Sequence, residues 1–465
     1  MSPYLKLEQQ KLVSLLLKFQ SRCLAIRQVH SHLITTGSFV RSHFLVWNKL
    51  LRLYSVGGPY PKEALMLYKS LQALACPVSP PPFDSFTYSF LLKACTNLGS
   101  AVTGSQYHAL TFKAGFSFHV YVQTALVDMY AFCGSLFQAK KVFSEMPDKN
   151  SVTWNALITG LIKWRKISDA RSLFDEMPSR TVVSWTGMID GYTRMNHSKE
   201  AMALFHKMIV QEGIDPSEIT LLTILPAVSV QGDIQQCRSI HCYAEKKGFI
   251  QHDIRVANSM IGVYGKCGCV ESAAKVFEEL SATRRNLVSG TSIISVLAMH
   301  GKATEALDQF CKMESENFKP NQITFVSILN ASSHGGLIEE GLGFFSKMIN
   351  KYQLQPDIKH YGCVIDMLGR AGRLKEAESI AIGIPKEMES VVIWRTLLGA
   401  CSLHDVAEMG KRVTERIFQM ESTYSGDYVL LSNIYSVTGK YEDAEITRNL
   451  MDNNKVFKVP GHSVL

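Results

Sequence analysis

The chain repeats itself about every 31 to 36 residues, and this period constrains the fold more than any other feature of the sequence. A period in the thirties is typical of a solenoid, in which each unit packs only against its neighbours. The function of such a protein lies along an extended surface rather than in one pocket. The clearest recurrence is an alanine followed four residues later by a phenylalanine, in the pairs Ala139 and Phe143, Ala170 and Phe174, and Ala201 and Phe205.

Each repeat has the pattern of two helices. In residues 151–181, apolar side chains at helical spacing predict a first helix from about Val152 to Trp164 and a second from about Ser168 to Met177. Neither helix can bury its apolar stripe alone, so neighbouring units must stack. We expect the alanine where the two helices cross closely, and the phenylalanine in the space between units. The proline cluster of residues 77–82 predicts a loop that bulges from the array.

Composition indicates an ordered, mildly basic protein. Apolar residues make up 46% and charged residues 19% of the 465 positions, and the net charge is +8, which permits a polyanionic partner. The 11 cysteines form no C-x-x-C pair, so we expect reduced thiols that serve as small core residues. No early apolar run approaches the ~18 residues of a membrane-spanning helix, and no membrane partner is predicted.

The N-terminal segment has two interpretations. Residues 1–43 carry six Lys and Arg against one acid, Glu8, a bias typical of an organellar transit peptide, which we place at 1–26. The alternative is an imperfect first repeat, because residues 28–33 already have the pattern of a helix. We divide the rest into a degenerate first repeat (27–43), a repeat array (44–390), two further helical pairs (391–458) and a tail (459–465).

Several phrases resemble the pentatricopeptide repeats of land-plant organelle proteins. Unit lengths that alternate in a patterned order are similar to the subgroup of long, short and standard repeats, and residues 428–435 resemble the E motifs that follow such arrays. The resemblance covers about residues 25–465. The phrases that carry it are Val183 to Thr186, the Phe-x-x-Met-Pro unit endings, Asn258 to Gly268, Met367 to Gly372, and Leu397 to Cys401.

The resemblance implies a right-handed, TPR-like α-solenoid of antiparallel helix pairs that binds single-stranded RNA, one base per repeat. The fifth residue of each first helix and the last residue of the same unit would contact the base. One hydrogen bond contributes only about 0.5–1.5 kcal/mol, so a single unit specifies little and several in series specify a sequence. A lone Asn or Thr is better explained as a solvated or capping residue than as an RNA contact, but recurrence in six units favours RNA contact.

Carried over residue by residue, the resemblance predicts six base-recognising pairs. Four other pairs, Ser89 with His119, Leu222 with Asp253, Val326 with Asp357, and Gly362 with Ser390, are expected to recognise little. The predicted RNA is U-x-A-Y-R-x-C-A-x-x from 5′ to 3′. The six pairs are Asn48 with Asp84 (uridine), Thr124 with Asn150 (adenosine), Asn155 with Thr181 (off-pattern, pyrimidine), Thr186 with Ser217 (purine), Asn258 with Asn286 (cytidine), and Thr291 with Asn321 (adenosine).

The second residue of each first helix is predicted to wedge between bases. Arg255 and Lys359 depart from the apolar pattern at this position, and we expect them to touch phosphate. The apolar members of this set are Val152, Val183, Ile219, Val288 and Ile323.

No motif for catalysis or for a cofactor is found. A zinc-dependent cytidine deaminase needs H-x-E and P-C-x-x-C, and the chain contains neither before it stops at Leu465. The phosphate loop G-x-x-x-x-G-K-[ST] is also missing. The histidines and cysteines are explained by packing rather than by metal binding, so we expect no cofactor, no metal and no enzymatic centre.

Three functions are compatible with these patterns. The first is a C-to-U RNA editing specificity factor that recruits a DYW-type deaminase in trans, together with accessory editing factors. The second is a factor for RNA stability, splicing or translation that acts by occupying RNA. The third is a protein-binding helical scaffold. The basic, acid-poor start favours the mitochondrion, with the chloroplast as the alternative.

Overall fold

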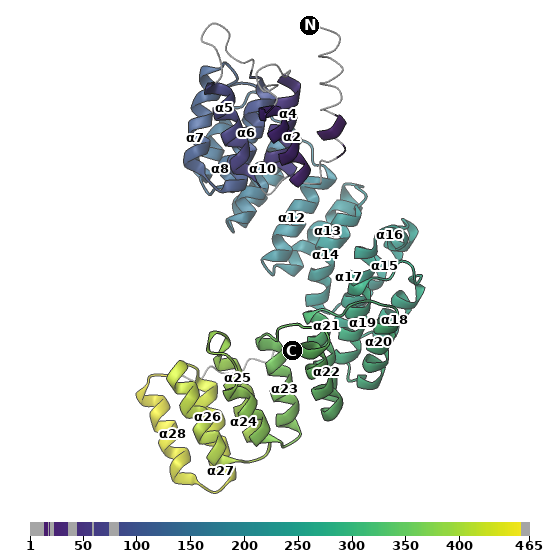
Figure 1. The fold of residues 1–465 in the computed structure, drawn as a ribbon, viewed down its shortest axis with the longest axis vertical. Helices are drawn as coiled ribbons and strands as arrows, with labels where there is room; N and C mark the ends of the chain where they lie inside the picture. The colour runs from purple at the N-terminus through teal and green to yellow at the C-terminus, as the bar shows by residue number, and fades with distance from the viewer. Residues whose placement is uncertain are drawn as a thin grey trace. The chain divides into compact units, whose positions relative to one another are not determined.

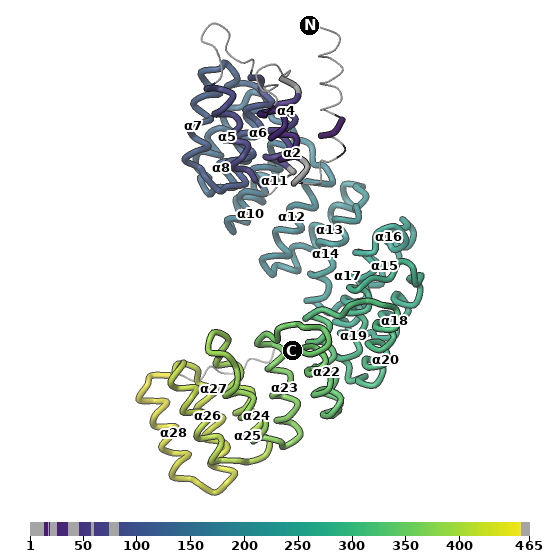
Figure 2. Tube along the Cα trace, in the orientation of Figure 1, coloured from purple at the N-terminus to yellow at the C-terminus, as the bar shows by residue number. Residues whose placement is uncertain are grey.

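The computed structural model describes residues 14–16, 18, 23–35, 44–57, 60–73 and 83–456. Every regular element in these ranges is a helix, and consecutive helices run antiparallel along the chain (Figures 1 and 2). The predicted all-α solenoid of helix pairs is thereby confirmed. The chain divides into two compact units, residues 1–227 and 228–465.

Among its described residues, the first unit holds five complete helix pairs, one further helix before them and one after them, and two short π-helical stretches. The π-helices, Leu53–Gly57 and Lys207–Gln211, extend α4 and α13 and were not expected from the sequence. The α-helices are α2 (Cys23–Thr35), α4 (Phe44–Arg52), α5 (Pro61–Ala73), α6 (Ser85–Leu98), α7 (Ala101–Lys113), α8 (Val120–Phe132), α9 (Leu136–Glu145), α10 (Ser151–Lys163), α11 (Ile167–Glu176), α12 (Val182–Arg194), α13 (Ser198–His206) and α14 (Glu218–Gln231), in which the unit ends.

The second unit continues the same alternation. It adds a short helix, α16, before α17 and a 3-10 turn at Lys386–Met388. Its α-helices are α15 (Ile234–Lys246), α16 (Phe249–His252), α17 (Ile254–Lys266), α18 (Val270–Glu279), α19 (Leu287–Met299), α20 (Ala303–Ser315), α21 (Gln322–Gly335), α22 (Ile338–Asn350), α23 (Ile358–Arg370), α24 (Leu374–Ile382), α25 (Val391–Leu403), α26 (Ala407–Met420), α27 (Ser425–Val437) and α28 (Tyr441–Asn453).

The first helices of neighbouring repeats pack directly on one another. This is so for α6, α8, α10 and α12 in the first unit, and for α17, α19, α21, α23, α25 and α27 in the second. Each first helix also packs on the second helix of its own repeat. The repeats therefore form two layers within each unit, with first helices in one layer. The helices predicted in residues 151–181 begin and end within one residue of α10 and α11.

The last residue of a repeat starts the first helix of the next one. Asn150 accepts a hydrogen bond from the backbone N–H of Thr153 at 2.9 Å, and Asn321 accepts one from Thr324 at 3.0 Å. Thr181, Asn286 and Asn321 each form a reciprocal capping box with the third residue of their helix. Such caps satisfy backbone donors that a helix start leaves unpaired, which explains where the first helices begin.

The recurring alanines and phenylalanines form the core, as predicted. Ala139, Ala170 and Ala201 are fully buried, which allows the two helices of a repeat to cross closely. Phe174 is 1% exposed and meets the Trp185 ring of the next repeat edge-on at 4.9 Å between centroids. Edge-to-face aromatic pairs of this kind add stability beyond the area they bury.

The expectation that the cysteines are core residues is wrong for most of them. Among the nine whose side chains are described, only Cys95, Cys237 and Cys401 are buried. Cys242 and Cys311 are exposed, because they lie on second helices, which keep one face open to solvent. The half-buried ones are Cys133, Cys267, Cys269 and Cys363.

Several sequence predictions lie outside the described residues. These include most of the predicted transit peptide, the proline cluster of residues 77–82 and the tail at 459–465. Among the helices that the structure describes, none is long and apolar enough to cross a membrane.

We expect Phe174→Ala to destabilise its repeat by about 3–5 kcal/mol, because truncation of a buried ring leaves a cavity between two repeats. Amide hydrogen exchange in α11 and α12 measures this locally, which matters because long repeat arrays do not unfold in two states. Phe137→Ala is the matched control, since the Phe137 ring on α9 is 76% exposed. Equal protection in the two variants would contradict this account of the core.

Candidate nucleic-acid interface

In five of the described first helices, the fifth residue is tied by its amide or hydroxyl to the third residue of the next first helix. Thr124 and Thr153 share a hydroxyl–hydroxyl bond of 2.8 Å across α8 and α10. The same link joins α12 to α14 and α19 to α21, at 2.7 and 2.8 Å, through Thr186 with Thr220 and Thr291 with Thr324. Where the fifth residue is an asparagine, its carbonyl accepts the bond at 2.8 Å, as in Asn48 with Thr87 and Asn258 with Ser289.

The third residue also bonds the capping residue of its own helix. The Ser289 hydroxyl donates to Asn286 Oδ1 at 3.1 Å, and the Thr324 hydroxyl donates to Asn321 Oδ1 at 3.0 Å. A fifth residue, the last residue of its repeat and the third residue of the next helix therefore form one network. We call this three-residue network the bridge. It brings together the two members of a predicted pair although they are far apart in sequence.

Two bridges contain a direct bond within the predicted pair. Asn258 Nδ2 donates to Asn286 Oδ1 at 3.3 Å. Asn48 Nδ2 donates to both carboxylate oxygens of Asp84 at 3.1 Å. In both the Asn–Asn and the Asn–Asp pair the fifth-residue amide therefore donates to the capping side chain.

Asn155 and Thr181, the off-pattern pair, do not form a bridge. The Thr181 hydroxyl bonds Ser184 at 3.1 Å in its capping box. Asn155 Oδ1 is buried and has no hydrogen-bond partner among the described residues. A buried acceptor without a partner is costly unless a ligand or water satisfies it.

The fifth residues are more recessed than the sequence predicted. We expected these amides and hydroxyls to contact a base, but Thr186, Asn258 and Thr291 expose only 8–9% of their surface. Close packing of successive first helices is the reason. Thr186 and Thr291 nevertheless line hollows between these helices.

Three hollows repeat one arrangement of side chains. Each has bridge residues among its lining and exposed second residues of two neighbouring helices. One is lined by Thr291 and Asn321 together with Val288 and Ile323. The others include Thr186, Ser217, Val183 and Ile219 in one case and Thr124, Asn155, Tyr121 and Val152 in the other.

The second residues form exposed apolar walls. The second residues Val152, Val183, Ile219, Val288 and Ile323 are between 55% and 66% exposed, and the recurrence of exposed aliphatic side chains at one helix position is the informative feature. Two more walls were missed by the sequence analysis, Phe86 and Tyr121, whose rings stack at 5.7 Å. Their position as second residues of α6 and α8 was the signal that could have identified them.

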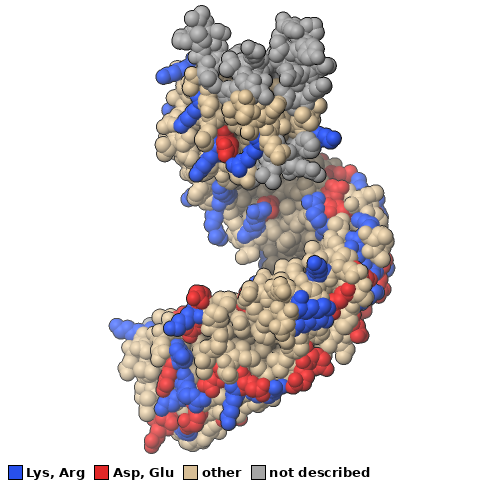
Figure 3. Space-filling model, viewed as in Figure 1, with Lys and Arg blue, Asp and Glu red and all other residues tan. Residues whose placement is uncertain are grey.

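The two basic second residues differ in their surroundings. The Arg255 guanidinium donates to Asp253 at 2.6 Å, and this hydrogen bond lowers the pKa of the Asp253 carboxyl despite some opposing burial. The charge of Arg255 is thus partly neutralised by Asp253. The Lys359 side chain is exposed to solvent. On the face shown in Figure 3, Lys and Arg lie interspersed with Asp and Glu and with uncharged surface.

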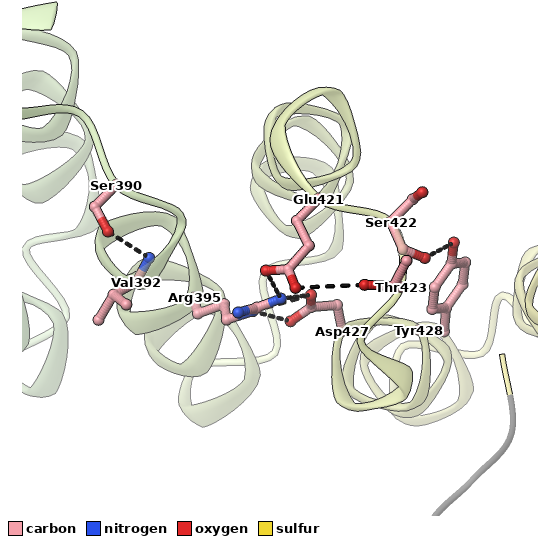
Figure 4. Close-up of polar contacts among 8 residues, drawn as sticks. All are labelled: Ser390, Val392, Arg395, Glu421, Ser422, Thr423, Asp427 and Tyr428. Atoms are coloured by element: carbon pink, nitrogen blue, oxygen red, sulfur yellow. Dashed lines mark hydrogen bonds and ion pairs between the residues drawn. The ribbon is translucent and has the colours of Figure 1, made fainter. Parts of the chain in front are cut away.

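The last small polar fifth residue is Thr291 in α19, and α23 and α25 depart furthest from the pattern. The fifth residue of α23 is Gly362, which has no side chain. In α25 it is Arg395, which donates to both oxygens of Asp427 at 3.0 Å and to Glu421 at 2.9 Å (Figure 4). Asp427 is only 4% exposed, and the Tyr424 ring lies 4.5 Å from the guanidinium carbon. The fifth positions of α23 and α25 thus offer a base no free side-chain amide or hydroxyl.

Known proteins match the chain along most of its length. A pentatricopeptide repeat-containing protein of Arabidopsis thaliana, named as mitochondrial, is 50% identical over 98% of this chain and 92% of its own length. The chain belongs to the pentatricopeptide repeat family. Another Arabidopsis member is 38% identical over 90% of this chain and 77% of its own length. The first relative's name assigns the protein to the mitochondrion, as predicted.

Family models match individual segments of this pentatricopeptide repeat protein. The E motif matches residues 404–465, and a pentatricopeptide repeat domain matches 275–334. The PPR repeat matches residues 124–151, 152–182, 183–211, 256–282, 323–352 and 359–380.

Solved structures give a looser likeness. The maize pentatricopeptide repeat protein PPR10 aligns with a TM-score of 0.48 and 17% identity, over 94% of this chain and 78% of its own. A structure of PPR10 in complex with an 18-nt psaJ RNA element aligns with a TM-score of 0.40.

We expect Arg395→Met to destabilise α25–α28 by about 3–5 kcal/mol, because it leaves the Asp427 carboxylate buried without its partner. Hydrogen exchange of the α27 amides measures the effect. Arg412→Met is the matched control: Arg412 pairs with Glu378 at 3.1 Å on the surface, where a pair contributes only about 0–1 kcal/mol. The double variant Arg395→Met/Asp427→Leu should recover most of the loss, and failure to recover would contradict the pairing argument.

Proposed function

We propose that this protein binds single-stranded RNA in the mitochondrion and recognises its sequence one base per repeat. The observation that carries the proposal is the recurrence, at the repeat step, of polar bridge residues in the lining of a hollow between exposed apolar walls. A nucleobase has a polar edge and two apolar faces. Its edge would enter the hollow while the walls pack against its faces.

The bridge residues keep hydrogen-bonding capacity for a base. A threonine at the fifth position uses one bond in its bridge but has one donor and two acceptor sites in all. Asn286 uses only its carbonyl oxygen in the bridge, so its NH₂ group has no partner among the described residues. The unpartnered Asn155 Oδ1 would accept from a base that offers a donor at its edge, which is consistent with the predicted pyrimidine.

The proposal keeps the RNA string predicted from the sequence. Residues 44–390 form the RNA-binding array, and the preferred RNA is U-x-A-Y-R-x-C-A-x-x, 5′ to 3′. Phosphate contacts would come from cations such as Lys359 rather than from a continuous basic stripe. Base contacts would therefore contribute much of the selectivity and phosphate contacts the salt dependence.

We further propose that the bound RNA is a substrate for C-to-U editing. The E-motif segment, proposed at 391–458, would recruit a DYW-type deaminase in trans, and the chain itself would supply no catalytic group. The match of residues 404–465 to the E motif supports this assignment. The family rule places the repeat at 358–390 opposite the base four positions before the edited cytidine.

We expect Asn286→Asp to shift the base preferred by its repeat from cytidine towards uridine, by about tenfold in the ratio of affinities, equivalent to about 1.4 kcal/mol. Aspartate caps a helix as well as asparagine, so α19 should stay folded. The bridge should adopt the arrangement already present in Asn48 and Asp84. The measurement is the affinity for two RNAs that differ only at that base.

The control for this swap is Asn350→Asp, which makes the same charge change on the exposed end of α22. This control variant should lower the affinity for both RNAs slightly and equally. An unchanged base ratio in the Asn286→Asp variant, with α19 still folded, would show that this pair does not recognise a base.

Disruption of the gene should abolish C-to-U editing at a site whose upstream sequence fits the predicted string, followed by three bases and the edited cytidine. Sequencing of mitochondrial cDNA from mutant and wild-type plants measures this. If editing is unchanged at every site while transcript ends are altered or introns are retained, the editing role is wrong, and a role in RNA stability or splicing by RNA occupancy takes its place. RNA affinity that is insensitive to salt would instead favour a protein scaffold.

A further inference from the structure

Two aromatic walls lie side by side in the first unit. Phe86 is the second residue of α6 and Tyr121 is the second residue of α8, and their rings stack with 5.7 Å between centroids and 30° between planes. The two residues are 50% and 59% exposed, so solvent reaches much of both rings. Among the first helices that the structure describes, only α6 and α8 carry an aromatic second residue.

The bridge is missing between the same two helices. The third residue of α8 is Val122, which is fully buried and has no polar side-chain atom. The fifth residue of α6, Ser89, donates its hydroxyl to the Ser85 carbonyl oxygen of its own helix at 2.8 Å. The last residue of the repeat, His119, does not cap α8 through its side chain, and its Nδ1 is buried without a partner among the described residues. The chemistry that distinguishes this repeat is therefore its aromatic walls.

The stacked rings continue the row of walls in the proposed interface. Tyr121 lines the same hollow as Thr124 and Val152. In the proposed function, the second residues of two consecutive first helices flank one base. Phe86 and Tyr121 therefore flank the base that faces residues 85–119, which is the second nucleotide of the predicted string.

We propose that Phe86 and Tyr121, which we call the aromatic clamp, hold the second nucleobase of the bound RNA between their rings and select a purine there. This proposal rests on the proposed binding of single-stranded RNA and deepens it. A flat base between two rings needs about 7 Å between their faces, twice the usual contact distance of about 3.5 Å. The stacked rings must therefore part to admit the base, and one ring–ring contact is exchanged for two base–ring contacts.

A purine gains more from this exchange than a pyrimidine does. Stacking on aromatic side chains accepts every base but differs in strength between bases, and the two fused rings of a purine cover more of each side chain. Because the rings are uncharged, their contribution should not depend on salt, in contrast to that of phosphate contacts. The first x of the predicted string therefore becomes a purine.

The test measures the affinity of the full-length protein for four RNAs that carry the predicted string and differ only at the second nucleotide. We expect both purines to bind about fivefold more tightly than both pyrimidines. At this nucleotide, the purine analogue 2-aminopurine should lose fluorescence on binding, because stacking quenches its emission. Equal affinity for all four RNAs would overturn the proposal.

The variant Phe86→Val/Tyr121→Val gives both positions the side chain that α10 and α12 carry there, and removal of exposed rings leaves no cavity in the core. We expect affinity for the purine RNAs to fall about tenfold and the purine advantage to disappear, with the salt dependence unchanged. Phe112→Val/Phe137→Val is the matched control, since it removes two rings that are 73% and 76% exposed on second helices, and it should keep the purine advantage. A purine advantage that survives without the clamp would show that the clamp does not select the base.

A change at the seventh nucleotide separates this proposal from the proposed function. If cytidine there still binds more tightly than uridine while the second nucleotide makes no difference, the aromatic clamp alone is wrong. If no nucleotide of the string affects the affinity, base recognition is wrong at every repeat, and the clamp is wrong with it.

Discussion

The hydroxyl at the third position of a first helix is the interaction on which the repeat structure depends. Thr324, for example, bonds the capping Asn321 of its own helix and Thr291 of the preceding one. One small polar group thus defines a helix start and joins two repeats. Because it is fully buried, loss of either partner would leave an unsatisfied polar atom, so the three bridge positions are constrained together.

The sequence predicted the parts of this fold that recur at a fixed step. The Ala–Phe pairs identified the core, and the apolar spacing identified α10 and α11 to within a residue. It did not predict how deeply Thr186 or Asn258 is recessed, because that depends on the distance between helices from different repeats. The bridge itself left a signal that single-helix reasoning overlooked: a Ser or Thr recurs three residues after each capping residue of the recognition pairs.

The C-terminal repeats replace the bridge by ionic contacts. At α25 the third residue is Ile393, which cannot bridge, and the fifth is Arg395, held by Asp427 and Glu421. These groups satisfy one another within the protein, whereas a bridge leaves capacity for a ligand. Asp427 lies 32 residues from Arg395 and is the third residue of α27, so this ion pair joins the same two positions as a bridge. The change in chemistry coincides with the start of the segment that precedes the E-motif match.

When recognition depends on many weak contacts in series, each contact must form with little loss of side-chain conformational entropy. A bridge residue is already hydrogen-bonded to protein, so its rotamer is restricted before any ligand arrives. The walls are mostly valine and isoleucine, whose branched side chains have few χ1 choices. Groups that are already ordered lose little freedom on binding, and more of each bond's 0.5–1.5 kcal/mol remains as affinity. The same packing that recesses Thr291 below the surface therefore prepares it to discriminate between bases.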